Sequence, residues 1–187
     1  MKNTFKKIAL TFGATGLLTL SGAALAKTSF KLTSPDIAPN KAFPMKHMLN
    51  QMGCTGENLS PAFNWSGAPE GTKSFVLTVF DKDAPTGSGW WHWVVYNIPA
   101  DANGLPAGIG AGATLPAGAV EGRVDGGAPH YGGPCPPVGQ THRYVFTLHA
   151  LKVASLPVPP DASPAMVGMM TTMNRLDKAS FMVKVKR

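Results

Sequence analysis

The chain has 187 residues and a net charge of +7, and 14% of its residues are charged. A chain of this length fits one domain that can bury about 70% of its unfolded surface, so it needs no metal or disulfide scaffold to fold. The positive charge is small and scattered along the sequence. It argues against nucleic-acid binding but is compatible with an anionic partner.

Residues 1–26 have the layout of a cleavable signal peptide. Three lysines precede a largely apolar stretch over residues 8–20, and the segment ends in the small-x-small sequence Ala24-Leu25-Ala26. This order of charge, apolar core and small residues is typical of export signals. We predict cleavage after Ala26, which leaves a periplasmic or secreted domain over residues 27–187 with a net charge of +4, because three lysines and no acid are removed.

The alternative for this segment is a membrane anchor, which the sequence disfavours. Gly13, Gly16 and Gly22 interrupt the apolar stretch, which makes a poor span of about 20 residues. No cysteine directly follows the signal, and no later apolar run is long enough to cross a bilayer. We therefore expect neither a lipid anchor nor stable membrane insertion.

The remaining elements are predicted from periodicity and from the 21 glycines and 17 prolines, which favour many turns. In chain order we expect a weak strand over 28–32, a short helix near 46–52, strands over 75–80 and 93–98, a loop over 104–118, a strand over 143–151, a helix from 163 to about 178, and a strand over 181–186. The uninterrupted apolar runs at 75–80 and 93–98 indicate strands buried on both faces, whereas the alternating runs near the C-terminus indicate half-buried strands. The pattern predicts a mainly β domain of sandwich-like or Greek-key type.

The predicted helix carries an unusual methionine pattern. Ser163 can cap it and Pro164 suits its first turn. Met166, Met169, Met170, Met173 and Leu176 follow at helical spacing. Methionine stripes of this kind usually fill gaps in a hydrophobic core, and we interpret this stripe in that way. We therefore expect no metal site. The alternative is Cu(I) binding, because thioethers suit that ion and a second group (Met45, His47, Met48 and Met52) lies near the N-terminus of the mature domain.

Cys54 and Cys135 are the two cysteines. In an oxidising compartment an isolated pair most often forms one disulfide, and two free thiols are the alternative. Metal binding is disfavoured because neither cysteine has a Cys-x-x-Cys neighbour.

Polar residues gather at three predicted strand ends, in segments 81–85, 89–93 and 132–144. If these strands are neighbours, two carboxylates, two imidazoles and a phenol converge. A histidine beside an aspartate has its tautomer fixed, and such a histidine with backbone N–H groups from a glycine-rich turn can hold a phosphate. Taken singly, Asp-x-Asp is an ordinary turn former and a histidine among tryptophans is an ordinary buried residue.

The same segments resemble the two signature blocks of the phosphatidylethanolamine-binding (Raf kinase inhibitor-like) protein family. The resemblance rests on 81–85, on Trp91-His92, and on Gly133-Pro134-Cys135-Pro136-Pro137 followed by His142-Arg143-Tyr144. Segments 53–61, 65–69, 97–99 and 115–118 resemble its bacterial YbhB/YbcL-type branch. The resemblance implies a central antiparallel Greek-key sheet packed on a smaller sheet, with a few short helices.

The resemblance also implies one pocket for phosphate-bearing anions. Carried over to this sequence, its residues are Asp81, Asp83, His92, Gly133, Pro136, Pro137, His142 and Tyr144. Three departures from the family pattern bear on this pocket: Lys82 in place of a common proline, Asp125-Gly126-Gly127 where an aromatic often follows the aspartate, and Cys135 within the second block.

The predicted function is an exported binding protein for a phospholipid head group or another phosphorylated group. The alternative is an inhibitor or modulator of a kinase, a protease or a host protein, and a weak hydrolase is third. Because the sequence lacks Gly-x-Ser-x-Gly and His-Glu-x-x-His, we expect no catalysis and no cofactor. A homodimer is compatible with the sequence.

Overall fold

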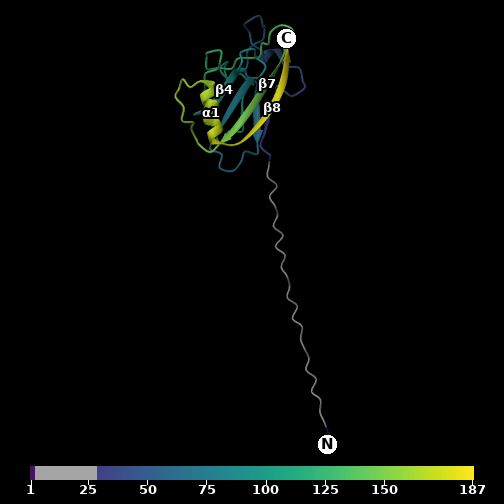
Figure 1. Cartoon of the computed structure of the whole chain (residues 1–187), viewed down its shortest axis with the longest axis vertical. Coiled ribbons are helices and arrows are strands. Elements are labelled where there is room, and N and C mark those ends of the chain that lie inside the picture. Colours follow the sequence, from purple (N-terminus) through teal and green to yellow (C-terminus); the bar gives the residue numbers. More distant parts are fainter. Residues whose placement is uncertain (3–28) are drawn as a thin grey trace.

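The fold is built from a large and a small antiparallel sheet. The computed structural model describes residues 1–2 and 29–187, so the predicted export signal and its cleavage site lie outside the described residues except for the first two. The large sheet has the strand order β6-β4-β3-β7-β8. Its bounds are β6 Val120–Glu121, β4 Trp90–Pro99, β3 Ser74–Asp81, β7 Thr141–Leu151 and β8 Arg175–Lys186. Figure 1 labels β4, β7 and β8 in this sheet and shows β8 leading to the C-terminus.

The small sheet covers one face of the large one. It pairs β1 (Lys31–Thr33), β2 (Phe63–Ser66) and β5 (Gly104–Leu105) in the order β1-β2-β5. Phe63 packs its ring 6.3 Å from Trp93 and 5.7 Å from Phe146, which places aromatic side chains of both sheets in one core. The predicted sandwich of a central sheet on a smaller sheet is confirmed.

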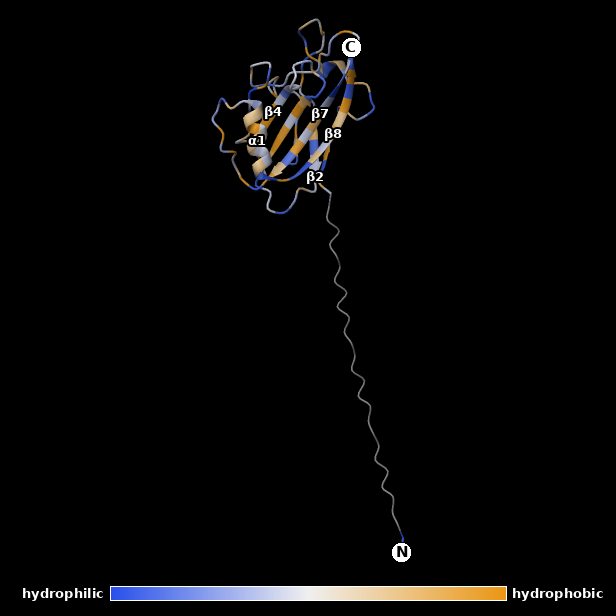
Figure 2. Cartoon of the chain, viewed as in Figure 1, coloured by the Kyte–Doolittle hydropathy of each residue, from blue (hydrophilic) through white to orange (hydrophobic). Residues whose placement is uncertain are grey.

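The opposite face of the large sheet lies under α1 (Pro164–Asn174) and the loop that precedes it. Val167 of α1 and Leu156 of the loop pack on Val76 and Val94 of the sheet. With one sheet face against β2 and the other against α1, β3 is buried on both sides, which explains its uninterrupted apolar run. Figure 2 shows the corresponding hydrophobic colouring along the strands of the large sheet.

The boundaries of several elements differ from those predicted. The helix ends at Asn174 rather than near residue 178, because Arg175 already pairs with Leu151 and begins the 12-residue strand β8. The expected helix near 46–52 is only the short 3-10 turn η1 (Met45–His47). The predicted first strand is β1, and residue 28 lies outside the described part. The loop over 104–118 contains the two-residue strand β5.

The prediction that the methionine stripe fills the core was wrong for most of its members, whereas Met170 does pack against the core beneath α1. The side of α1 that is buried carries Pro164, Val167 and Thr171, whereas Met166, Met169 and Met173 are exposed. Across residues 1–2 and 29–187, no helix has both the length and the apolar character required to cross a bilayer.

His149 is a largely buried titratable residue of β7. It alternates with Leu148 and Ala150 of the inter-sheet core, so its side chain lies on the opposite face. Its Nδ1 atom has no hydrogen-bond partner. Burial, with smaller contributions from the positive charges of Arg175 and Lys178, lowers its pKa to about 4.

This burial predicts acid-sensitive stability. The unfolded chain takes up a proton at His149 near its ordinary pKa, whereas the folded chain does so only near pH 4. The free energy of unfolding should therefore fall by about 3 kcal/mol at this site as pH drops from about 6.5 to about 4. Urea unfolding across this range should show the loss in the wild type and a shallower loss in His149→Gln. Replacing the exposed His130 by Gln is the control, and equal pH dependence in all three proteins would contradict the assignment.

Candidate functional site

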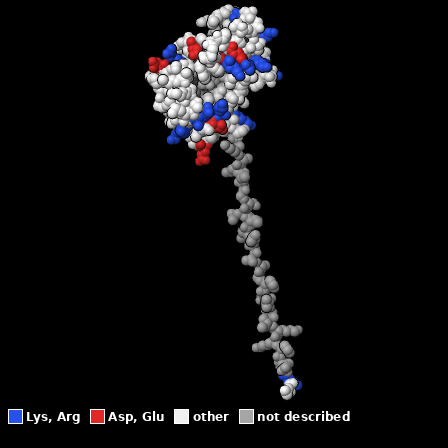
Figure 3. Space-filling view, in the orientation of Figure 1, with Lys and Arg blue, Asp and Glu red and all other residues white. Residues whose placement is uncertain are grey.

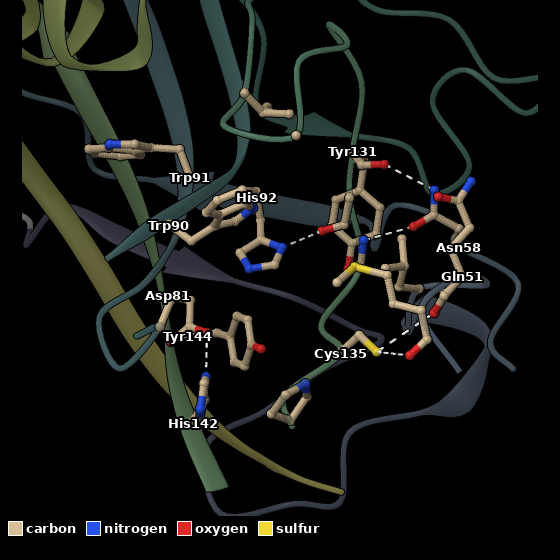
Figure 4. Close-up of a pocket in the computed structure, with 18 of the residues that line it drawn as sticks. Gln51, Asn58, Asp81, Trp90, Trp91, His92, Tyr131, Cys135, His142 and Tyr144 are labelled. Carbon is tan, nitrogen blue, oxygen red and sulfur yellow. Dashed lines mark hydrogen bonds and ion pairs between the residues drawn. The ribbon is translucent and has the colours of Figure 1, made fainter. Parts of the chain in front are cut away.

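A cavity of about 460 Å³ lies at the edge of the large sheet where β3 ends and β4 and β7 begin. Seven of the eight predicted site residues line it: Asp81, His92, Gly133, Pro136, Pro137, His142 and Tyr144. Figure 4 shows the Asp81, His92, His142 and Tyr144 side chains gathered on one side of this space, with Tyr131, Asn58 and Cys135 opposite.

The strand register explains why residues distant in sequence converge. β3 runs antiparallel to both of its neighbours, so its C-terminal end meets the N-terminal ends of β4 and β7. Asp81, the last residue of β3, lies directly across from Trp90 on one side and Tyr144 on the other. The three polar clusters predicted to converge are therefore brought together by one strand end.

His92 is placed by an irregularity in this pairing. Val79 pairs with Trp93 and Phe80 pairs with Trp91, so His92 has no partner on β3. Such a bulge bends the strand and redirects a side chain, and bulges are frequent beside functional sites. The Nδ1 atom of His92 lies 2.8 Å from the carbonyl oxygen of Gly132. Because a carbonyl can only accept, Nδ1 carries the proton and donates to it.

The remaining ring nitrogen of His92 is therefore an acceptor when the ring is neutral. Burial lowers the pKa of His92 below its ordinary value of 6.5, and this outweighs the opposing effects of the Gly132 hydrogen bond and of Asp81. At neutral pH the site presents the unprotonated Nε2 of an uncharged imidazole.

Asp81 and His142 form a buried pair. Asp81 is 2% exposed and His142 is 3% exposed. Nδ1 of His142 donates to the Asp81 carboxylate over 2.6 Å, and Nε2 of the same ring lies 2.9 Å from Oε1 of Gln140. The other oxygen of Asp81 accepts from the backbone N–H of Asp83 over 2.9 Å. Both ring nitrogens of His142 thus have protein partners, and the residue positions Asp81 rather than offering a free nitrogen.

Tyr144 supplies a hydroxyl group beside this pair. Its ring meets that of His92 edge-on, with centroids 5.1 Å apart. Burial raises the pKa of Tyr144 well above its ordinary value, and the negative charge of Asp81 raises it further. The phenol keeps its proton at every physiological pH and can donate a hydrogen bond.

Asp83 is the predicted site residue that does not line the cavity. Its carboxylate accepts from the backbone N–H and from Nε of Arg143, each over 2.8 Å. The side-chain hydrogen bond from Arg143 is the largest cause that lowers the pKa of Asp83, to about 2. Asp83 closes the turn after β3 and pairs with Arg143 at the surface.

The glycine-rich turn also differs from the prediction, because its N–H groups serve the fold. Gly132 donates to the carbonyl of His92 over 2.9 Å, and Gly133 donates to Oδ1 of Asn58 over 2.7 Å. The three prolines of this segment have no N–H. A Cβ atom at Gly133 would overlap the carbonyl of His47, so only glycine fits there. The turn therefore provides a wall rather than donors for an anion.

Two residues that hold this wall were not predicted as part of the site. Asn58, with φ of 55°, donates to the carbonyl of Tyr131 over 3.1 Å while its oxygen accepts from Gly133. Tyr131 is 2% exposed, and its hydroxyl donates to the carbonyl of His47 over 2.8 Å. Asn58 lies in one of the segments that carry the family resemblance, whereas no sequence signal marked Tyr131.

Two departures from the family pattern, Lys82 and Gly126, lie at different places: Lys82 is at the surface, and Gly126 is in the cavity wall. Lys82 is exposed, and its N–H donates to the carbonyl of Arg143 over 3.2 Å. Gly126 lines the cavity without a side chain, while the preceding Asp125 accepts from the N–H of Trp91 over 2.8 Å.

The Met and His group over residues 45–52 does not form a common surface. His47 is fully buried, with Nδ1 2.7 Å from the carbonyl of Leu59, whereas Met45 and Met52 are exposed. In the described part of the chain, no three His, Cys, Asp or Glu side chains are grouped as metal ligands.

A family model described as phosphatidylethanolamine-binding protein matches residues 33–186. The chain belongs to the phosphatidylethanolamine-binding protein family. Within it, the chain is 49% identical over 151 residues to YbhB of Escherichia coli (strain K12), covering 80% of this chain and 96% of that one.

A solved relative shows the same fold. The crystal structure of Escherichia coli YbcL, described as a member of the mammalian PEBP family, has a TM-score of 0.80 and 44% identity, covering 84% of this chain and 98% of that one. A more distant relative, the lipoprotein LppC of Mycobacterium tuberculosis (strain H37Rv), is 37% identical over 141 residues, or 75% of this chain and 64% of that protein. The family is named for binding rather than for a reaction, in line with the expectation of a binding protein.

The Cys54–Cys135 disulfide joins two loops across 81 residues at the cavity mouth. Cys135, which stands between Pro134 and Pro136 in the sequence, lines the cavity. The side chain of the C-terminal residue, Arg187, donates to the carbonyl of Gly53 over 2.6 Å and so braces the same loop.

Removing this bridge should lower stability without unfolding the domain, because the two-sheet core does not depend on it. The double variant Cys54→Ser/Cys135→Ser should lose at most about 4.5 kcal/mol of unfolding free energy, by the loop-closure model. Thermal unfolding by circular dichroism measures this. A reducing agent should lower the melting temperature of the wild type and leave that of the variant unchanged. A variant with the same melting temperature as the oxidised wild type would contradict this expectation. A variant without tertiary structure at about 25 °C would contradict it as well.

Proposed function

We propose that the domain binds a phosphomonoester in its monoanionic form, in the cavity at the end of β3. The observation that carries this proposal is the combination of a neutral acceptor, His92, with a protonated donor, Tyr144, beside the paired carboxylate of Asp81. Membership of a family named for phosphatidylethanolamine binding supports a phosphate-bearing ligand.

The charge state of the ligand follows from the groups that face it. A phosphate oxygen can accept from the Tyr144 hydroxyl, whereas Nε2 of His92 needs a donor from the ligand. The P–OH group of a monoanion supplies that donor. A dianion supplies none and brings a second negative charge toward Asp81, whose own charge is already held by His142.

The rest of the cavity indicates that the phosphate carries an organic group. The walls include Leu49, Met52, Trp90, Trp91 and Pro136, which are predominantly apolar. A volume of about 460 Å³ is typical of small-molecule sites and leaves apolar space beyond the phosphate itself. A head group such as phosphoethanolamine, or an aryl phosphate, would use that space, and inorganic phosphate would not.

Calorimetry with phosphoethanolamine, phenyl phosphate and inorganic phosphate tests the proposal. Tyr144→Phe and His92→Ala should each weaken binding of the organic phosphates about tenfold, the effect of one lost hydrogen bond of about 1.4 kcal/mol. Asp83→Asn is the matched control, since Asp83 stands two residues from Asp81 but faces Arg143 and not the cavity. Binding that is unchanged in both cavity variants, with their folds intact, would refute the site.

The pH dependence of the same titration tests the charge state. Affinity should fall as pH rises through about 6, where the second proton leaves a phosphomonoester. Burial lowers the pKa of His92, which favours the neutral form of its ring over this titration. Affinity that is constant or rises between pH about 5.5 and about 8 would contradict the monoanionic form.

A surface for protein contact is the second candidate. Met52 and Val138 are 82% and 78% exposed, and both lie at or beside the wall that contains Pro137. Apolar side chains around a ligand site would suit a modulator that binds a phosphorylated segment of another protein. A phosphopeptide that binds much more tightly than phenyl phosphate would favour this candidate.

We also propose that the domain works outside the cytoplasm after signal cleavage. The Lys-rich start and Ala24-Leu25-Ala26 support export, as do the Cys54–Cys135 bridge and the lipoprotein relative. An oxidising compartment would keep the bridge at the cavity mouth intact.

N-terminal sequencing of protein recovered from outside the cytoplasm should begin at Lys27 or within a residue or two of it. Replacing Ala24 and Ala26 by bulky residues should slow processing, because the cleavage site requires small side chains. A mature protein that still carries Met1 would contradict export by this route.

A further inference from the structure

Helix α1 presents methionine side chains to solvent. Met166, Met169 and Met173 are 41%, 56% and 64% exposed. The buried side of the helix is formed by Pro164, Val167 and Thr171, so these thioethers do not fill the core. This exposure removes the usual structural explanation for a helical methionine stripe.

The three side chains lie on one side of the helix. At 100° per residue, positions 166, 169 and 173 fall within an arc of about 60°. Met169 is three residues after Met166 and four before Met173, the two spacings at which side chains on a helix are neighbours, with Cβ atoms about 5–6 Å apart. Methionine is unbranched and flexible, so the sulfur of Met169 can meet that of Met166 or that of Met173 around one ion. Met166 and Met173 are about 10 Å apart along the helix axis, so Met169 is the member common to both pairs.

The helix places no charged group and no imidazole beside these methionines. Residues 164–174 include no acidic or basic side chain and no histidine. Figure 3 shows an uncharged surface over α1 in this view, with the charged side chains at its margins. A site made only of neutral thioethers discriminates strongly among metals, because Zn²⁺, Mg²⁺ and Ca²⁺ prefer nitrogen or oxygen ligands.

We propose that Met166, Met169 and Met173 form a surface site for Cu(I), or for the chemically similar ion Ag(I), in which Met169 binds the ion together with either Met166 or Met173. Thioethers are soft ligands that select Cu(I). They need no deprotonation, so the site keeps its ligands at acidic pH, where histidine and thiolate sites lose theirs. Both cysteines of the chain are in the disulfide, which leaves methionine as its soft ligand. The site belongs to α1 and is independent of the phosphate cavity at the end of β3.

Silver titration of protein labelled with ¹³C at the methionine methyl groups tests the site without redox chemistry. In chloride-free buffer, one equivalent of Ag(I) should shift the methyl signals of residues 166, 169 and 173. The variant Met166→Leu/Met169→Leu/Met173→Leu keeps side-chain size and helix propensity but has no sulfur at these positions. Its Ag(I) dissociation constant should rise at least tenfold. Losing a residue that only supports a metal ligand already weakens metal binding by roughly tenfold, and these residues are the ligands themselves.

The matched control is Met45→Leu/Met182→Leu, which removes two exposed methionines that lie outside the helix and outside the cavity wall. It should bind Ag(I) as the wild type does, and both variants should keep wild-type circular dichroism and phosphoethanolamine affinity. The proposal is overturned if the wild type binds no Ag(I), if all exposed methionine methyls shift together, or if the triple variant binds as tightly as the control.

Discussion

The buried carboxylate of Asp81 is the constraint on which the site depends. It ends the central strand β3, and the register on both sides of that strand sets Trp90 and Tyr144 beside it. An unpaired charge at 2% exposure would be strongly destabilising, so the hydrogen bonds from His142 and from the Asp83 N–H are required by the fold as well as by the site. The packing of the two sheets sets the position of β3, and the end of β3 sets the position of the Asp81 carboxylate.

The polar groups around Asp81 divide into those that hold the site and those that can meet a ligand. His142, Asp83, Gly132 and Gly133 are engaged within the protein. Nε2 of His92 and the hydroxyl of Tyr144 remain directed at the cavity. A site with so few donors beside a carboxylate differs from a cluster of cationic side chains that binds anions by charge alone. This arrangement is the basis for proposing a phosphate ligand that still carries a proton.

Much of the fold could be predicted because the strongest signals are local. The apolar runs of β3 and β4, the alternation in β7 and the Ser163-Pro164 helix start are direct consequences of burial and capping. Convergence at the strand ends was also predictable, since antiparallel neighbours bring these ends together. The family resemblance then selected seven residues that do line the cavity.

The remainder depends on contacts that the sequence does not specify. The bulge that redirects His92 is a register shift between two strands, and the engagement of Asp83 depends on where Arg143 falls on β7. The turn glycines meet partners from 40 to 75 residues away. Helical spacing shows that the α1 methionines share a side, but only packing decides that this side faces solvent.

The central claim is that His92 is a neutral acceptor poised for a protonated phosphate. Long-range ¹H–¹⁵N NMR of the imidazole nitrogens at pH about 7 tests it directly, because the two ring nitrogens report separately which of them carries a proton. The account predicts a His92 ring with a proton on Nδ1 and none on Nε2, and a shift of the Nε2 resonance when phosphoethanolamine is added. A doubly protonated His92 ring in the free protein at that pH, or an Nε2 signal that does not respond to the ligand, would contradict it.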